Sequence, residues 1–195
     1  MNDISELMDE CASTHPRGWE YQKKMIHPIP NTSVVDRERF ILERCRNKAV
    51  INFGCASGGL HGAIKSVANH IIGLDKRQPC DILIDFDNIK HEGPSLFGDL
   101  AICGEVLEHL SNPGRFLDYL WRFKMSIIFT VPNALSEIAR RYANTGIESV
   151  NNDHVSWYSY HTMKVLLERH GFSNMEWYWY NGRAIFAEGL VVVAE

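Results

Sequence analysis

The chain has 195 residues, which is near the size of one domain of about 150 residues, so we expect a single core. Hydrophobic residues make up 45% and charged residues 23% of the chain, a composition that is typical of a folded globular protein and excludes a disordered or fibrous one. Twenty Lys and Arg residues against 24 Asp and Glu residues give a formal net charge of −4, and no segment carries the basic cluster that binding to duplex nucleic acid requires.

The N-terminal segment and the cysteines exclude further classes. The first ten residues contain four acidic and no basic side chains, which is the wrong polarity for a targeting peptide. The longest uncharged stretch, residues 49–64, contains four glycines and Asn52, so it cannot form a membrane span. The five cysteines form no C-x-x-C pair, which argues against a disulfide framework or a structural zinc site. We therefore expect a cytoplasmic protein without a membrane span.

The first part of the chain is expected to lie outside the core. Residues 1–33 carry proline-rich turns and no regular apolar pattern, which predicts a short leading helix and a loop that form a lid or extension. Residues 34–195 are predicted to form the core. From Val34 to Arg46 the apolar residues recur at helical spacing, so an amphipathic helix is expected there.

The next segment predicts a strand, a glycine turn and a helix. Ala49–Phe53 is a β-prone run that ends at Gly54, and helical spacing resumes at Leu60. Two apolar runs that end in carboxylates, His70–Asp75 and Asp81–Asp85, are the next strands. Because a parallel crossover usually needs about a dozen residues, either a tight loop replaces the helix between these two strands or the later strand is very short.

The second half of the chain continues the alternation of strands and helices. Asn112 and Pro113 are expected to open a helix, because proline favours the first helical turn, and Asn181-Gly182 separates two terminal β runs that predict a hairpin. The predicted strands are Leu100–Cys103, Met125–Val131, Met175–Tyr180 and Leu190–Ala194, and the predicted helices begin at Asn112, span Ala134–Tyr142 and span Tyr160–His170.

Strands that alternate with helices favour an α/β fold with a doubly wound parallel sheet, in which ligands bind at the carboxyl ends of the strands. Gly54 and Gly58 would let the backbone approach a ligand closely after the first of these strands. Asp75, about twenty residues further on, can accept hydrogen bonds from both hydroxyls of a ribose. Asp85 beside Phe86 suits the amino edge and the face of an adenine.

Five motifs occur in an order and spacing that resemble the class I S-adenosylmethionine-dependent methyltransferases. They are Val50–Leu60, Gly73–Asp75, Asp81–Asp85, Glu105–Leu110 and Asn112-Pro113. The later segments Val131–Asn133, Asn152–Ser159 and Leu166–Phe172 are similar to small members of the family that act on quinones, sugars and other metabolites. The resemblance implies a Rossmann-like sheet of about seven strands in the order 3-2-1-4-5-7-6, with the seventh strand antiparallel and a short or missing helix between strands 2 and 3.

The resemblance also implies the cofactor, S-adenosyl-L-methionine, and the residues that hold it. The glycine loop would line the methionine part, Asp75 the ribose, Asp85 and Phe86 the adenine, and Gly104 the methyl-donor end. The implied cofactor residues are Asn52, Gly54, Ala56, Ser57, Gly58, Asp75, Lys76, Asp85, Phe86 and Gly104. Asn52 and Ala56 depart from the acid and the glycine that the family usually has there, which motivates a non-catalytic cofactor-binding protein as one alternative.

The catalytic candidates are Glu105, His109 and His154. Glu105, Glu108 and His109 fall at i, i+3 and i+4, so a helical turn would place them on one face. His109 would act as general base because its unperturbed pKa of about 6.5 suits neutral pH. One alternative is a purely structural role of these residues in the turn. Another is a divalent-metal site that they form with His154, as in metal-dependent 2′-O-methyltransferases of small RNAs. We expect no metal.

The predicted function is transfer of a methyl group to an O or N atom of a small-molecule acceptor. Methyl transfer is an in-line displacement, so the protein must align the reactants, exclude water and in some cases remove a proton. A metal-dependent RNA 2′-O-methyltransferase is the alternative of the same fold. A nucleic-acid acceptor is not expected. A chain with a net charge of −4 gains no favourable free energy from release of the counterions that surround a polyanion.

Overall fold

A computed structural model describes residues 27–30, 32–55, 59–89 and 93–195. The chain divides into two compact units, Met1–Pro30 and Asn31–Glu195. Of the first unit only residues 27–30 are described, so the leading helix and lid expected over residues 1–33 fall almost entirely outside the described residues.

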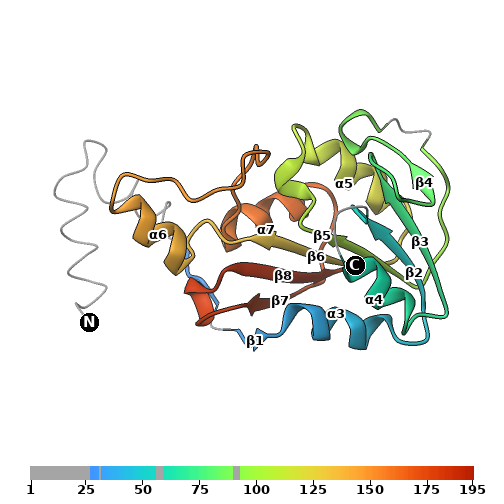
Figure 1. Cartoon of the computed structure of the whole chain (residues 1–195), viewed down its shortest axis with the longest axis horizontal. Helices are drawn as coiled ribbons and strands as arrows, with labels where there is room; N and C mark the ends of the chain where they lie inside the picture. The colour runs from blue at the N-terminus through green and yellow to red at the C-terminus, as the bar shows by residue number, and fades with distance from the viewer. Residues whose placement is uncertain (1–26, 31, 56–58, 90–92) are drawn as a thin grey trace. The chain divides into compact units, whose positions relative to one another are not determined.

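The second unit is built on one eight-stranded sheet (Figure 1) in the order β1-β7-β8-β6-β5-β2-β3-β4. Without β1, and read from β4, this is the expected order 3-2-1-4-5-7-6, which is confirmed. As expected, the last strand runs antiparallel to both of its neighbours, whereas every other pair is parallel. The strands are β1 (Val34–Val35), β2 (Ala49–Phe53), β3 (His70–Asp75), β4 (Ile82–Leu83), β5 (Leu100–Gly104), β6 (Ser126–Pro132), β7 (Met175–Tyr180) and β8 (Gly189–Ala194).

The predicted helix over Val34–Arg46 is wrong in its first turn. Val34 and Val35 pair with β7 as the edge strand β1, because β-branched residues favour an extended backbone. The helix α3 (Arg37–Cys45) begins after Asp36, whose carboxylate accepts a hydrogen bond from the Arg39 backbone N–H. The N-cap therefore sets the true helix start.

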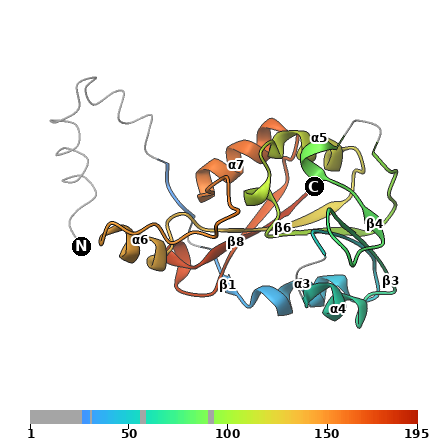
Figure 2. The ribbon, with the colours of Figure 1, turned by 45° about the horizontal axis from the view of Figure 1, so that its top comes forward.

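Helices cover both faces of the sheet. Figure 2 shows α3 and α4 (Leu60–Lys65) on one face and α5 (Pro113–Trp121) and α7 (Tyr160–Arg169) on the other. This arrangement confirms the doubly wound α/β prediction. One fully buried cluster between α3, α4 and the sheet includes Ile41, Ile64 and Ile102.

The loop between β3 and β4 replaces the usual crossover helix. Only residues 76–81 join the two strands, and β4 is two residues long, so both expected solutions of this short connection occur together. The Asp81 carboxylate accepts a hydrogen bond of 2.6 Å from the Gly73 backbone N–H. This bond holds the loop against β3.

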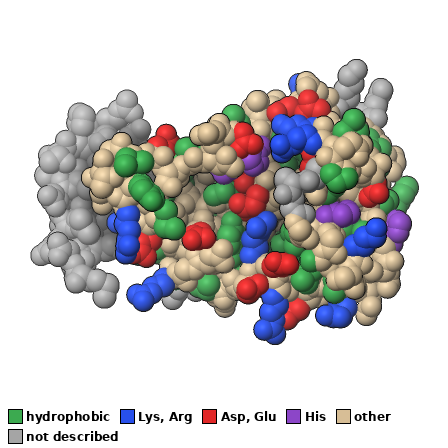
Figure 3. Space-filling model, viewed as in Figure 1, with side chains coloured by type: hydrophobic (Ala, Val, Ile, Leu, Met, Phe, Trp, Pro, Cys, Tyr) green, Lys and Arg blue, Asp and Glu red, His purple; other side chains and the backbone are tan. Residues whose placement is uncertain are grey.

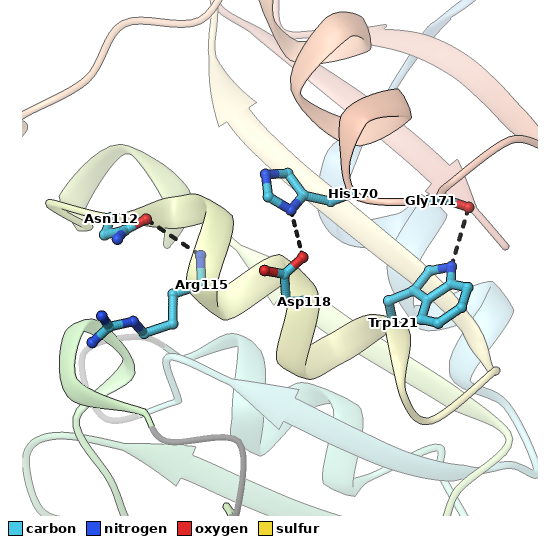
Figure 4. Close-up of polar contacts among 6 residues, drawn as sticks. All are labelled: Asn112, Arg115, Asp118, Trp121, His170 and Gly171. Carbon is cyan, nitrogen blue, oxygen red and sulfur yellow. Dashed lines mark hydrogen bonds and ion pairs between the residues drawn. The ribbon is translucent and has the colours of Figure 1, made fainter.

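Helices α5 and α7 are tied together by polar contacts (Figure 4). His170 Nδ1 lies 2.6 Å from Asp118 Oδ1, and the Trp121 indole donates a hydrogen bond of 3.1 Å to the Gly171 carbonyl. Asn112 caps α5 by accepting from the Arg115 N–H, and Gly171 adopts φ +90° just after α7, as the sequence predicts for both positions.

The remaining elements are short. Helix α6 (Glu137–Ala143) starts three residues later than the predicted Ala134–Tyr142, because the Ser136 hydroxyl forms its N-cap and accepts from the Ala139 N–H. Single 3₁₀ turns lie at Phe86–Asn88, Leu107–His109 and Ala184–Phe186. Within the described part of the chain, no helix has the length and apolar character needed to cross a membrane. The four cysteines in that part are free thiols, and three of them are buried.

Candidate active site

A cleft of about 520 Å³ opens at the carboxyl ends of the strands, where the sequence predicts a ligand. Of the predicted cofactor residues, it brings together Gly54, Asp75, Lys76, Asp85 and Phe86. The cleft then continues to two predicted catalytic residues. The other lining residues are Arg77, Glu105, Val106, His109, Leu110 and Asp153.

Gly54 is required at the floor of this cleft. Its φ is +77°, and a Cβ atom added there would lie 2.4 Å from Cγ2 of Val106. Its backbone N–H donates to the Leu74 carbonyl, which holds the loop close to β3. A side chain at this position would therefore both strain the backbone and collide with the neighbouring strand end.

The carboxylates of Asp75, at the end of β3, and Asp85, just after β4, differ in their exposure and hydrogen bonds. Asp75 is only 6% exposed, and its Oδ1 accepts a hydrogen bond of 2.9 Å from the Arg77 N–H. Asp85 is exposed and forms the N-cap of the first 3₁₀ turn by accepting from the Asp87 N–H. Both carboxylates line the cleft at the start of a loop, and each also accepts a hydrogen bond that fixes the backbone of its loop.

Phe86 is mainly a core residue. Its ring centroid lies 4.7 Å from that of Phe116 and 5.8 Å from that of Phe53. The side chain is buried, and only its margin borders the cleft. An adenine could therefore meet one edge of this aromatic cluster rather than a free ring face.

Some predicted cofactor residues are not part of the cleft lining. Asn52 is buried within β2, and its Nδ2 lies 3.2 Å from Nδ1 of His61 in the following helix. Gly104 ends β5, and a Cβ atom there would lie 3.3 Å from the Arg37 guanidinium. Ala56, Ser57 and Gly58 lie outside the described residues.

Glu105 is held in one position by hydrogen-bond partners from two other strands. Its Oε1 accepts hydrogen bonds from Thr130 Oγ1 at 2.9 Å and from the Tyr180 hydroxyl at 2.8 Å. Arg37, at the start of α3, donates from Nε to Thr130 Oγ1 at 3.2 Å. The Glu105 backbone has φ +55°. Such a backbone conformation in a non-glycine residue persists only where the surroundings fix it.

The register of the terminal hairpin makes room for Tyr180. Tyr180 pairs directly with Gly189, and a Cβ atom added at Gly189 would lie 2.0 Å from the tyrosine ring. The missing side chain lets the phenol cross its partner strand and reach Glu105. Burial, followed by the charge of Glu105, raises the pKa of the Tyr180 hydroxyl, which therefore stays a hydrogen-bond donor.

Glu108 is buried without a hydrogen-bond partner. Glu108 is only 1% exposed, and neither of its carboxylate oxygens has a hydrogen-bond partner among the described residues. Burial, followed by the nearby charge of Glu105, raises the pKa of Glu108 to about 8. An unpaired buried carboxyl group is costly, and a cation or a hydrogen-bonding group in contact with Glu108 would offset that cost.

The sequence predicts that Glu105, Glu108 and His109 lie on one face of a helical turn, and this prediction is wrong. The turn is a 3₁₀ turn over Leu107–His109, and Glu105 lies before it in a left-handed conformation. Glu105 is therefore directed to Thr130 and Tyr180, as described above, while Glu108 and His109 are directed to the loop that carries His154.

The loop that carries Asp153 and His154 is fastened to the acidic motif. The backbone N–H groups of Val155 and Ser156 both donate to the Glu108 carbonyl, at 2.8 and 3.2 Å. His109 Nδ1 lies 3.3 Å from both the backbone carbonyl and the Oδ2 atom of Asp153. These acceptors favour a proton on Nδ1, which leaves Nε2 of His109 as the basic nitrogen.

His154 and His109 form a pair between the cleft and the loop. Their ring centroids are 4.6 Å apart, with the planes at 85°. Burial, followed by the neighbouring His109, lowers the pKa of His154 below its usual 6.5. His154 is therefore neutral at pH 7.

Glu108, His109 and His154 could hold a metal ion, because each offers one ligand atom and these atoms lie within 4.8 Å of one another. The unpartnered Glu108 carboxylate fits such a role, since a cation would supply the missing contact. One carboxylate and two imidazoles suit a divalent transition metal such as Mn²⁺ or Zn²⁺. Glu105 borders this set but is already engaged by Thr130 and Tyr180.

Three residues of this site were missed by sequence reasoning: Arg37, Thr130 and Tyr180. They come from α3, β6 and β7, at 25 to 75 positions from Glu105. No local motif links them to the acidic segment. Only the strand order, which sets β6 beside β5 and the hairpin beside β6, brings Thr130 and Tyr180 to Glu105. Arg37 joins this site through its hydrogen bond to Thr130.

Comparisons with known proteins concern the family and the fold. A family model described as "Methyltransferase domain" matches residues 22–176. A search of curated proteins found no match.

Several solved structures share the fold. The chain is similar to a SAM-dependent methyltransferase from Archaeoglobus fulgidus, with 14% identity and a TM-score of 0.60 over 81% of this chain and 94% of that one. It is similar to the methyltransferase domain of a bacterial Hen1, CtHen1-CN, with 17% identity and a TM-score of 0.61 over 81% and 97% of the two chains. It also resembles the small RNA methyltransferase HEN1, with 17% identity and a TM-score of 0.63 over 87% of this chain and 27% of that one. At such identities the likeness concerns the fold alone.

Proposed function

We propose that this chain, which belongs to the class I S-adenosylmethionine-dependent methyltransferases, methylates a hydroxyl oxygen of a small-molecule acceptor. One observation carries the proposal: the cleft that begins at Gly54 and Asp75 ends at His109, whose Nδ1 is held by Asp153 and whose ring adjoins His154. A cofactor cleft that ends at an oriented imidazole suits methyl transfer coupled to removal of a proton.

In this proposal, different residues of the cleft contact different parts of the cofactor. Asp75 would accept the ribose hydroxyls, Lys76, Asp85 and the edge of Phe86 would border the adenine, and Gly54 would let the methionine part lie against the backbone. Asn52 and Gly104 would act indirectly, by shaping β2 and the end of β5.

The cofactor supplies an electrophilic methyl group on a sulfonium with a good leaving group. His109 Nε2 would accept the proton of the acceptor hydroxyl as the new C–O bond forms and the old C–S bond breaks, and would then release that proton to solvent. Asp153 orients His109, much as a carboxylate orients the imidazole of other acid–base pairs. His154 stays neutral and can accept a hydrogen bond from the acceptor.

The test compares two histidines that have similar partners. His109 and His170 each place Nδ1 beside an aspartate, but His170 lies between α5 and α7, outside the site. Replacing His109 with Ala should lower turnover by roughly 10² to 10⁴, whereas His170→Ala should leave turnover unchanged. Transfer of labelled methyl groups to a panel of hydroxyl acceptors measures both, and full turnover in His109→Ala would refute the base assignment.

A second candidate is supported by the unpartnered carboxylate of Glu108. In it, Glu108, His109 and His154 would hold a divalent cation, which would supply Lewis acidity toward an acceptor hydroxyl. The acceptor could then be a ribose 2′-hydroxyl, since two solved structures of similar fold are named as a small RNA methyltransferase and a bacterial Hen1. The net charge of −4 counts against an RNA acceptor.

Metal removal separates the two candidates. Proton removal by His109 alone predicts that EDTA leaves turnover unchanged. The metal candidate predicts that EDTA abolishes turnover, that Mn²⁺ or Mg²⁺ restores it, and that Glu108→Gln prevents the restoration. Methylation of an RNA oligonucleotide with an affinity that falls steeply with added salt would favour the RNA acceptor.

A further inference from the structure

Helix α6 and the loop after it expose an unusual amount of apolar surface. No side chain of α6 is fully buried, and Ile138, Tyr142 and Ile147 are all exposed, the last by 53%. Figure 3 shows hydrophobic side chains on this face in the region that α6 occupies in Figure 1. Contiguous exposed apolar surface commonly marks a binding site.

This surface is hollowed into two connected parts. The inner hollow, of about 460 Å³, includes His154 in its wall. The outer hollow, of about 780 Å³, runs along α6 and the loop over residues 146–149. The two share Ala139, Ser149 and Trp157, so they adjoin each other, and we call them together the α6 groove.

The α6 groove leads to the reaction centre described above. His154 lines its inner end, and the ring of His154 is 4.6 Å from that of His109, which lines the cofactor cleft. The histidine pair therefore borders both the cofactor cleft and the α6 groove. A molecule in the inner hollow would approach the methyl-donor end of the cleft beside these two rings.

The polarity of the α6 groove changes along its length. The inner hollow offers hydrogen-bonding side chains, namely those of Asn151, Ser156 and Glu188, beside His154. The outer hollow is lined mainly by small and apolar residues, Ala134, Ala139, Ala143, Gly146 and Ile147, together with Trp157. A ligand that matches both parts has a polar head and an apolar extension.

The charges of the α6 groove disfavour an anionic ligand. Among the described residues that line it, Arg140 is the only Lys or Arg, and its guanidinium lies over the Phe186 ring at 4.8 Å. Glu148 and Glu188 contribute negative charge. A polyphosphate chain would lose hydration there without gaining cationic partners.

The walls of the α6 groove are held by backbone contacts. Asn133 and Tyr158 form a β-bridge, and the Ala134 N–H donates to the Tyr158 carbonyl at 2.8 Å. The Ile147 N–H donates to the Tyr142 carbonyl at 3.0 Å. The α6 groove is thus formed before a ligand binds, which reduces the entropic cost of binding.

We propose that the α6 groove binds the methyl acceptor, and that this acceptor is an uncharged amphiphile whose hydroxyl-bearing head occupies the inner hollow while an apolar chain lies along the outer hollow. The inference rests on the proposed function, since it names the acceptor class for the same reaction. Trp157 borders both hollows and contacts the junction of head and chain.

The test uses 4-alkylcatechols with chains from ethyl to octyl, titrated by calorimetry into the enzyme saturated with S-adenosylhomocysteine, at concentrations below micelle formation. Each added methylene should lower the Kd by about twofold, roughly half the factor that full burial of a methylene gives, because the outer hollow is open on one side. The dependence on chain length is the signature of the outer hollow.

Two exposed apolar residues provide a matched pair of variants. Ile147→Ser should flatten the dependence of Kd on chain length, because Ile147 lines the outer hollow. Phe97→Ser removes an 87% exposed aromatic ring from the loop before β5 and should retain the wild-type dependence. Both positions are exposed, so neither substitution threatens the core.

Three results would overturn the inference. The first is a Kd that does not change with chain length, and the second is the same dependence in Ile147→Ser as in the wild type. The third is methylation of an RNA oligonucleotide with no binding of any alkylcatechol. Failure of the proposed function looks different, because it appears as the absence of S-adenosylhomocysteine binding or as full turnover in His109→Ala.

Discussion

At the scale of single residues, the site contrasts two glutamates that stand three positions apart. Glu105 accepts hydrogen bonds from Thr130 and Tyr180, so its negative charge has partners. Glu108 has none among the described residues and is buried. Because burial disfavours the charged form, the Glu108 carboxyl group is pushed toward its protonated form at neutral pH.

Glu108 should make the stability of the metal-free protein depend on pH. Its pKa is about 8 in the folded chain and about 4.5 in the unfolded one, so the folded state binds the proton more tightly. The stability contributed by that proton is complete below pH 4.5 and is lost as the pH rises through about 8. Glu108→Gln removes this loss, and at pH 7 to 8 it should raise the unfolding free energy by about 3 to 4 kcal/mol relative to the wild type, or roughly 6 to 16 °C in Tm.

Thermal unfolding in EDTA at pH 5 and pH 8 measures this effect. Glu43→Gln is the control, because it removes the same charge from an exposed side chain that pairs with Arg39, and it should change Tm little at either pH. A Tm difference between Glu108→Gln and the wild type that is the same at both pH values would contradict the account.

At the scale of elements, strand ends and loops bring the site together. The sequence predicts the strands that carry Gly54, Asp75 and Glu105, because apolar runs that end in glycine or a carboxylate stand out. It does not predict the edge strand β1, since two valines before an N-cap aspartate also fit the start of an amphipathic helix. It does not predict the 3₁₀ turn at Leu107–His109 either, because the i, i+3, i+4 spacing suits an α-helical turn equally well.

The pairing of β7 with β8 should be sensitive to a single methyl group. Gly189→Ala would place a Cβ atom 2.0 Å from the Tyr180 ring, so the ring must move and its hydrogen bond to Glu105 must break. We expect a loss of about 1 to 3 kcal/mol in unfolding free energy and a lower turnover. Denaturant unfolding and the methyl-transfer assay check both.

A second glycine serves as the control for this substitution. Gly62 lies in α4, and a Cβ atom added there meets nothing within 4 Å. Gly62→Ala should therefore stabilise the protein by about 0.5 to 1 kcal/mol through helix propensity. Equal stability of Gly189→Ala and the wild type would show that Tyr180 does not depend on the space that Gly189 leaves.

At the scale of the whole molecule, the predicted strand order is confirmed, whereas the composition of the site was only partly predictable. The family motifs run along the chain and mark β2 to β5, so the cofactor cleft could be placed from them. Thr130 and Tyr180 reach Glu105 only through the order β7-β8-β6-β5, and Arg37 joins them by a hydrogen bond to Thr130. The spacing of these residues along the sequence does not predict these contacts. The α6 groove was also not predicted, because residues 144–157 match no periodic pattern.

The most direct test of the account is a crystal structure of the protein with S-adenosylhomocysteine. We expect the ribose hydroxyls to contact Asp75 and the adenine to lie beside Asp85 and Phe86. The sulfur should face Glu105 and the pair of His109 and His154. A ligand bound outside this cleft, or one whose sulfur points away from the two histidines, would contradict it.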